Sequence, residues 1–185
     1  VYPGHGAGSA CGKNMSKETI GSIGHEKATN YALRADMTKQ DFVKEVTEGI
    51  LPPPAYFPEN VRLNKQGYNP ENDNIAKANI SLLVEEFKAK SVLERVIVLD
   101  VRNAADFVKG FIPNSIFIGI DGTFAPWVGT VIKKVETPIL LVCDKHRLEE
   151  VAIRLSRVGF DNILGHLSGG IEAWVQEDLI TISSI

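Results

Sequence analysis

Cys143 is the residue whose type and position best suit covalent chemistry in this chain. It follows the apolar run Ile139–Val142, which predicts a buried strand, and a helix pattern begins at Leu148. A free thiol has a pKa near ~8.5, and the positive end of a helix dipole with nearby cations lowers it by several units. The spacing therefore predicts a nucleophilic sulfur facing the start of a helix.

Charges of both signs surround that sulfur in the sequence. Asp144 follows it directly, and Glu149 and Glu150 stand in the first turn of the expected helix, where carboxylates raise the cost of forming a thiolate. The opposing cations are Lys145, His146 and Arg147, and we expect Asp144, Lys145 and His146 to contact the substrate. The alternative is that Cys143 is a small buried residue at a strand end, as free cysteines often are.

Asp100 and Arg102 form a second candidate pair, because they follow the β-branched run Val96–Leu99. In the functional reading, Asp100 takes part in the site around Cys143. In the structural alternative, Asp100 accepts backbone N–H bonds at a strand-end turn and Arg102 is exposed. His166 has no partner at a defined spacing, and we expect it in a loop.

His5 is a candidate metal ligand. It stands in Pro3-Gly-His-Gly6, where glycines allow the backbone to approach an ion closely. A metal needs several ligands at once, and the chain has no other His/Asp cluster to supply them. We therefore expect no bound cofactor here, and His5 to act as a metal ligand only within a longer parent protein.

Strands and helices alternate over residues 75–182. The strands expected are Val96–Leu99, Ser115–Ile118, Ile139–Val142 and Asn162–Gly165, and the helices are 82–90, 104–109, 124–134, 148–158 and 169–176. Trp127, Val131 and Ile132 are expected on one face of the helix over 124–134. Continuous apolar strands separated by helices predict an α/β fold, with a parallel sheet covered on both faces. Ligands of such sheets sit beyond the carboxyl ends of the strands, where Asp100 and Cys143 stand.

Residues 1–65 have a different pattern, which predicts a mainly helical, proline-rich segment. Helices are expected over 17–35 and over Lys39–Gly49, the second capped by Thr38. The run Leu51–Pro58 cannot be a helix or a central strand. Residues 66–74 are polar and rich in turn-forming residues, and this pattern predicts a linker. Because residues 1–65 hold few apolar side chains, and because the chain opens on Val1, we expect it to start inside a longer protein.

The composition excludes several classes. With 44% hydrophobic and 23% charged residues and a net charge of -3, the chain is an ordinary globular one with no basic surplus for nucleic acid. No apolar run approaches the roughly 18 residues that a membrane span requires. The two cysteines, Cys11 and Cys143, suggest no disulfide framework, which favours a reducing, cytoplasmic setting.

Four motifs in order make residues 75–182 resemble a rhodanese domain: Leu99-Asp-Val-Arg102, Gly110-Phe-Ile-Pro113, the strand-end Cys143 before a helix, and Gly169-Gly-Ile-Glu-Ala-Trp174. The resemblance implies that Cys143 accepts sulfane sulfur as a persulfide, with Arg147 and Asp100 assisting. The family's active pattern has glycine third and arginine fifth after the cysteine. Here His146 and Leu148 hold those places, so the loop is expected to be shortened.

Residues 1–65 resemble the C-terminal tail of a metallo-β-lactamase-fold hydrolase of the glyoxalase II and persulfide dioxygenase branch. The matching pieces are Pro3-Gly-His-Gly6, Ile23-Gly-His-Glu26 with Asn30-Tyr-Ala-Leu33, and Asp41-Phe-Val43 with Leu51-Pro-Pro-Pro54. This resemblance implies that the parent holds Zn or Fe, with His5 as the last histidine of that metal site.

Two functions follow from these resemblances. The first is a sulfurtransferase-like module that binds or relays sulfane sulfur for a fused metallohydrolase, taking thiosulfate or a low-molecular-weight persulfide. The second is a catalytically inactive rhodanese-fold module for interaction or dimerisation. The expected partners are the small sulfur substrate, the upstream metallohydrolase domain and, as a further candidate, a second copy of the chain, with no nucleic acid and no membrane.

Overall fold

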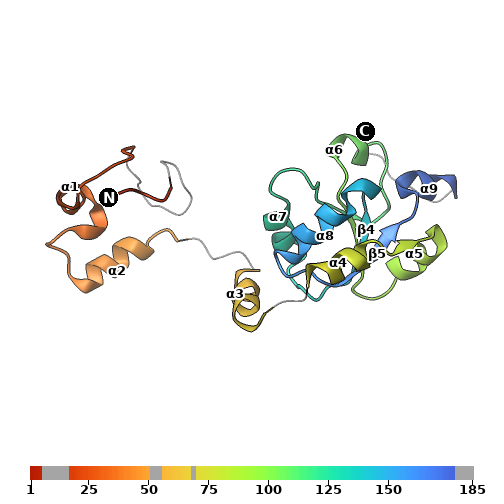
Figure 1. Ribbon diagram of the computed structural model, residues 1–185, viewed down its shortest axis with the longest axis horizontal. Coiled ribbons are helices and arrows are strands. Elements are labelled where there is room, and N and C mark those ends of the chain that lie inside the picture. Colours follow the sequence, from red (N-terminus) through yellow and green to blue (C-terminus); the bar gives the residue numbers. More distant parts are fainter. Residues whose placement is uncertain (6–16, 51–55, 68–69, 178–185) are drawn as a thin grey trace. The chain divides into compact units, whose positions relative to one another are not determined.

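The computed structural model describes residues 1–5, 17–50, 56–67 and 70–177. The chain divides into two compact units, Val1–Pro52 and Pro53–Ile185 (Figure 1). This division falls earlier than the expected boundary at residue 65. Each unit is described by itself.

The first unit is helical where it is described. Its elements are α1 (Ile23–Thr29), the 3-10 turn η1 (Tyr31–Leu33) and α2 (Lys39–Thr47). Thr38 caps α2 as expected, because its hydroxyl accepts the Asp41 N–H at 3.1 Å. The helix expected over 17–35 is shorter, beginning only after Gly21 and Ser22. None of these three helices has a buried residue, in line with the small number of apolar side chains.

A five-stranded parallel sheet forms the centre of the second unit, with strand order β1-β5-β4-β2-β3. The strands are β1 (Ser81–Leu82), β2 (Ile97–Asp100), β3 (Ile116–Phe117), β4 (Ile139–Val142) and β5 (Ile163–Leu167). All four residues of β4 are buried, because helices cover both faces of the sheet. The predicted α/β fold class is confirmed.

Helices pack on the two faces of this sheet (Figure 1). One core includes residues of α4 (Glu71–Ala78), α7 (Phe124–Val131) and α8 (Leu148–Ser156). The other core includes residues of α5 (Val84–Ser91) and α9 (Gly170–Gln176). Two further helices are α3 (Phe57–Gln66) and the short α6 (Ala104–Phe107).

Local details go beyond what the patterns predicted. The face expected to carry Trp127, Val131 and Ile132 is not the buried face of α7, because Phe124 and Val128 are buried while Trp127 is 58% exposed. Helix α4 begins inside the expected linker, where buried Asn74 donates hydrogen bonds to Ser156 and Asp161. This amide ties α4 to α8 and to the turn after it, a contact between distant segments that no local pattern reveals.

The start of α3 is a further difference. Phe57 and Pro58 were expected to be non-helical, yet they open this helix. Proline is compatible with a first helical turn, because the N–H it lacks there has no intrahelical partner.

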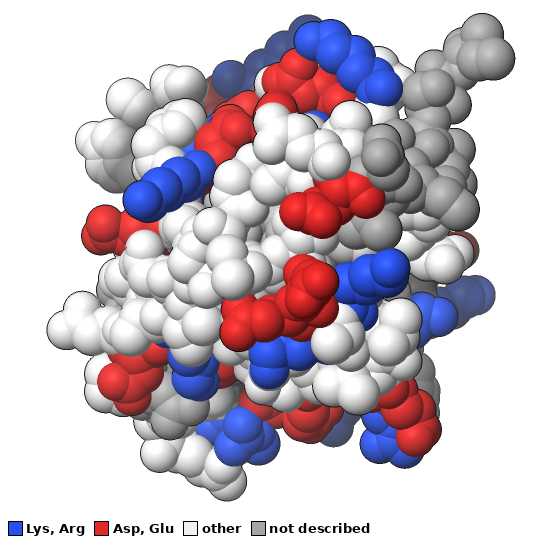
Figure 2. All heavy atoms as spheres, turned by 90° about the vertical axis from the view of Figure 1, so that its right-hand side faces the viewer, with Lys and Arg blue, Asp and Glu red and all other residues white. Residues whose placement is uncertain are grey.

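Basic and acidic side chains alternate over the face of the molecule shown in Figure 2 rather than gathering by sign. Nucleic-acid binding relies on clustered cations that neutralise phosphates, and this face offers no such cluster. Among the described residues, no helix is both long and apolar enough to cross a bilayer.

A buried ion pair closes the carboxyl end of β2. The carboxylate of Asp100 is fully buried, and the Nη2 atom of Arg102 lies 2.6 Å from its Oδ2. Asp100 also accepts the backbone N–H of Arg102 at 3.1 Å, and Nη2 of Arg102 donates to the Gly110 carbonyl at 2.9 Å. The backbone bond expected for Asp100 is confirmed, whereas the exposed position expected for Arg102 is wrong.

Replacing Asp100→Asn leaves the Arg102 guanidinium buried without its counter-charge, which typically costs about 3–5 kcal/mol. We expect a loss of this size in the free energy of unfolding, measured by urea titration. Both tryptophans, Trp127 and Trp174, lie in this unit, so their fluorescence reports its unfolding. The matched control is Asp106→Asn, whose exposed pair with Lys109 makes a small contribution. Equal losses in the two variants would show that the buried pair has no special role.

Candidate functional site

Cys143 lies one residue beyond β4, at the edge of the sheet where the carboxyl ends of β2 and β4 meet. Its side chain is only 7% exposed, yet it lines a cavity of about 380 Å³. The cavity is lined by the loop after β4, the end of β5, the start of α9 and the segment before β1, through residues that include Asp144, Lys145, His166, Ser168 and Glu172.

The main chain after Cys143 turns a carbonyl group toward the sulfur. The Cys143 Sγ donates a hydrogen bond to the Asp144 carbonyl oxygen at 3.4 Å, and the Arg147 N–H donates to the same oxygen at 2.9 Å. A single 3-10 turn, η2 (Lys145–Arg147), then runs directly into α8. The connection is therefore short, and the group bonded to the sulfur is an acceptor, which stabilises the thiol over the thiolate.

The electrostatic environment of Cys143 also favours the thiol over the thiolate. Burial, and after it the carboxylates of Asp144 and Asp100, raise the pKa of the Cys143 thiol to about 12, while Arg147 acts to lower it. The predicted effect of Asp144 is therefore found, and Asp100 adds to it from the neighbouring strand. Near neutral pH the sulfur is a thiol in this conformation.

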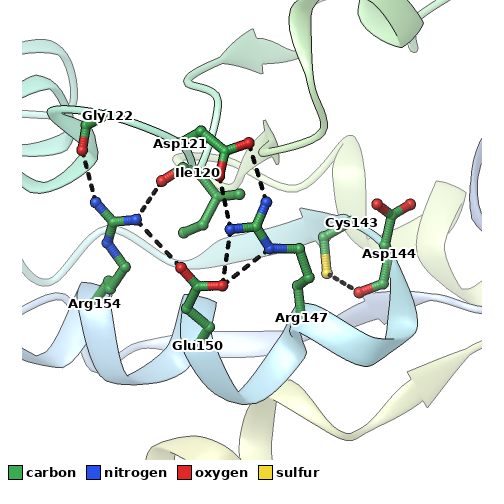
Figure 3. Close-up of polar contacts among 8 residues, drawn as sticks. All are labelled: Ile120, Asp121, Gly122, Cys143, Asp144, Arg147, Glu150 and Arg154. Carbon is green, nitrogen blue, oxygen red and sulfur yellow. Dashed lines mark hydrogen bonds and ion pairs between the residues drawn. The ribbon is translucent and has the colours of Figure 1, made fainter.

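The guanidinium of Arg147 is held by two carboxylates, that of Glu150 in α8 and that of Asp121 in the segment before α7 (Figure 3). Its Nη2 and Nη1 donate to the two oxygens of Asp121 at 2.9 and 3.2 Å, and its Nε donates to Glu150 at 2.9 Å. These bonds raise the pKa of Arg147 and lower that of Asp121. Arg154 extends the network, because it pairs with Glu150 at 3.4 Å and donates to the Gly122 carbonyl at 2.8 Å.

The structure separates the residues that were expected to act together. Cys143, Asp144 and Lys145 line one cavity, whereas His146 lines a different one beside Glu149, Glu150 and Arg154. Asp100 acts on the sulfur through its charge but is bonded to Arg102. Arg147 is engaged by Asp121 and Glu150.

His166 is a residue of the cavity that sequence reasoning missed. It was expected in a loop, but β5 extends to Leu167 and includes it. Its side chain is 6% exposed, and Nδ1 lies 2.8 Å from the Ala78 carbonyl oxygen. A histidine inside an otherwise apolar strand was the available signal, because a buried polar group needs a partner or a role.

His5 is exposed in the first unit. Within the described part of the chain, no three His, Cys, Asp or Glu side chains lie close enough together to hold a metal ion. The residues that the structure describes thus do not make a metal centre by themselves.

Replacing Asp144→Asn removes a carboxylate that raises the pKa of Cys143. We expect alkylation of Cys143 by iodoacetamide to be roughly 3- to 10-fold faster at mildly alkaline pH, since a larger fraction of the sulfur is ionised. The measurement uses a Cys11→Ser background so that Cys143 is the only thiol. Glu149→Gln is the matched control, an equal charge change on the adjoining helix. An unchanged rate in Asp144→Asn would contradict the proposed effect of this charge.

Comparisons with known proteins agree with this architecture. The family model described as a rhodanese-like domain matches residues 83–177. A metallo-beta-lactamase structure from Staphylococcus aureus matches at 25% identity with a TM-score of 0.59, covering 90% of this chain. The chain spans only 44% of that protein. No match was found among curated proteins.

Two smaller proteins are also similar. A rhodanese-related protein from Thermoplasma volcanium is 24% identical, with a TM-score of 0.42, and covers 56% of this chain and 98% of its own. A single-domain sulfurtransferase from Saccharomyces cerevisiae is 18% identical, with a TM-score of 0.42, and covers 55% of this chain and 92% of its own.

The expected likeness to a metallo-β-lactamase protein is confirmed, because the Staphylococcus aureus match covers more of the chain than the rhodanese-like region alone. The family model covers just over half of the 185 residues and includes β2 to β5 with Cys143. This chain belongs to the rhodanese-like domain family.

Proposed function

We propose that this chain accepts sulfane sulfur on Cys143 as a persulfide and passes it on, in the service of a metallohydrolase within the same protein. The observation that carries the proposal is the position of Cys143, at the carboxyl end of β4 and on the wall of a cavity that also holds Lys145. Ligands of parallel α/β sheets bind at this edge.

The size and charge of the cavity favour a small anionic donor. A volume of about 380 Å³ suits thiosulfate or a low-molecular-weight persulfide better than a macromolecule. Lys145 supplies a cation for the donor, while Asp144 and Glu172 line the same cavity and disfavour strongly charged anions. A singly charged persulfide therefore fits better than the thiosulfate dianion.

The partner hydrolase is part of the same proposal. The similarity to a metallo-beta-lactamase over 90% of this chain supports a parent protein that contains such a domain. In that parent, His5 would contribute to a site for Zn or Fe. The sulfur chemistry needs a free thiol, so we place the module in the reducing cytoplasm.

A second candidate is a catalytically inactive module for interaction or dimerisation. The observation in its favour is the environment of the sulfur, where burial, Asp144 and Asp100 raise the pKa to about 12 and a carbonyl faces Sγ. A thiol held in this way is a poor nucleophile unless a base removes its proton.

Persulfide trapping separates the two candidates. After incubation with glutathione persulfide, we expect intact-mass analysis to show a gain of one sulfur atom. The gain should disappear in Cys143→Ser and persist in the control Cys11→Ser, since Cys11 lies outside the described residues and has no part in the proposal. No gain in the wild-type chain would reject the relay and support the inactive module.

Lys145 and His146 give a matched test of where the donor binds. We expect Lys145→Gln to slow sulfur loading from thiosulfate about fivefold, because a charge pair 4 Å apart in water is worth about 1 kcal/mol. The loss should shrink at high salt. His146→Gln should leave the loading rate unchanged, because His146 lines a different cavity. The reverse ranking of the two variants would place the donor elsewhere.

A further inference from the structure

His166 lines the cavity that also holds Cys143. The backbone oxygen of Ala78 only accepts hydrogen bonds, so the Nδ1 atom 2.8 Å away must carry a hydrogen. In the neutral ring, Nε2 then has the lone pair. The residue is 6% exposed, and among the described residues its ring makes no hydrogen bond besides the one to Ala78. Nε2 is not one of the fully buried polar atoms that lack a partner, which agrees with an opening of this atom into the cavity that the ring lines.

The strand register places this ring beside Cys143. His166 is paired with Leu141, so the two residues point to the same face of the sheet. Cys143 is two residues beyond Leu141 and points to that face as well, because side chains alternate along a strand. The two residues are therefore diagonal neighbours on adjacent strands that line one cavity, and since no direct hydrogen bond joins their side chains, one water molecule would bridge them.

Charged groups around the cavity come from three elements. Asp144 and Lys145 belong to the loop after β4, and Glu172 belongs to α9. The segment before and within β1 adds only the uncharged side chains of Asn79 and Ser81. An imidazolium ion formed here is thus flanked by two carboxylates and one ammonium group, an arrangement that tolerates a transient positive charge.

We propose that His166 is the general base that takes the proton of the Cys143 thiol through Nε2 when sulfur is transferred. This inference rests on the proposed function, since it names the base for that reaction. It also addresses the obstacle found at the site, where burial of the sulfur, the carboxylates of Asp144 and Asp100, and the backbone carbonyl favour the thiol. A thiolate and an imidazolium stabilise each other, as in enzymes whose cysteine is paired with histidine.

The transfer balances without an added oxidant. The proton of Cys143 moves to Nε2, and the thiolate attacks the terminal sulfur of a donor R–S–SH. A new S–S bond forms on Cys143 while the S–S bond of the donor breaks. The leaving R–S⁻ takes the proton from the imidazolium, so the products are the Cys143 persulfide and R–SH.

The test variant is His166→Asn, because the amide nitrogen of asparagine can replace Nδ1 as the donor to Ala78 while Nε2 is lost. The probe is glutathione persulfide, with iodoacetamide as a second reagent that needs no sulfur transfer. We expect both reactions of Cys143 to be about 100-fold slower near neutral pH, the lower end of the range for general-base catalysis. Urea unfolding checks that the variant remains folded.

The pH profile separates a base from a structural role. In the wild type, the rate should change little across mildly alkaline pH, because a base takes the thiol proton during the reaction and prior ionisation of the sulfur is not needed. In His166→Asn the rate should instead rise about tenfold per pH unit toward the pKa of the thiol. A wild-type rate that also rises tenfold per pH unit overturns the inference even where the variant fails to fold.

Failure of the proposed function is distinguishable from failure of this inference. Histidine-dependent alkylation without any sulfur gain rejects the relay but supports His166 as the base. Sulfur gain at the same rate and with the same pH profile in His166→Asn supports the relay but overturns the role of His166.

Discussion

Burial of β4 on both faces is the constraint on which the second unit depends. All four of its residues are buried, and parallel strands β2 and β5 hydrogen-bond along its two edges. Because a parallel neighbour requires a crossover connection, the chain must pass over a face of the sheet between strands, and the helices that result cover both faces. The hydrogen-bonded part of this strand ends at Val142, and Cys143 is the first residue beyond it.

The same burial that positions the sulfur also makes it hard to ionise. A site that forms a persulfide needs donors directed at the sulfur, whereas here an acceptor, the Asp144 carbonyl, faces it. Desolvation is the largest cause of the raised pKa, so the difficulty arises chiefly from the fold and only secondarily from Asp144 and Asp100. Sulfur chemistry at this place thus depends on a base brought by another strand.

The side chain of Arg147 binds carboxylates outside the cavity of Cys143. A guanidinium forms its strongest bonds with carboxylates in a planar, two-point geometry, and Asp121 offers both oxygens in this way (Figure 3). Glu150 lies one turn along α8 and accepts from the same guanidinium. The cation therefore supports the loop between β3 and α7, while the cavity beside Cys143 is left with Lys145.

Much of this protein follows from its sequence alone. Apolar runs predict β2, β4 and the start of β5 closely, and Thr38 predicts the cap of α2, because these features depend on neighbours a few residues apart. The strand-end position of Cys143 was predictable for the same reason. The tertiary structure alone decided that Asn74 draws the expected linker onto α8, that Arg147 turns to Asp121, and that His166 shares a cavity with Cys143. Each of these contacts joins residues far apart in the chain, and its free energy depends on burial and partners that exist only after the sheet has formed.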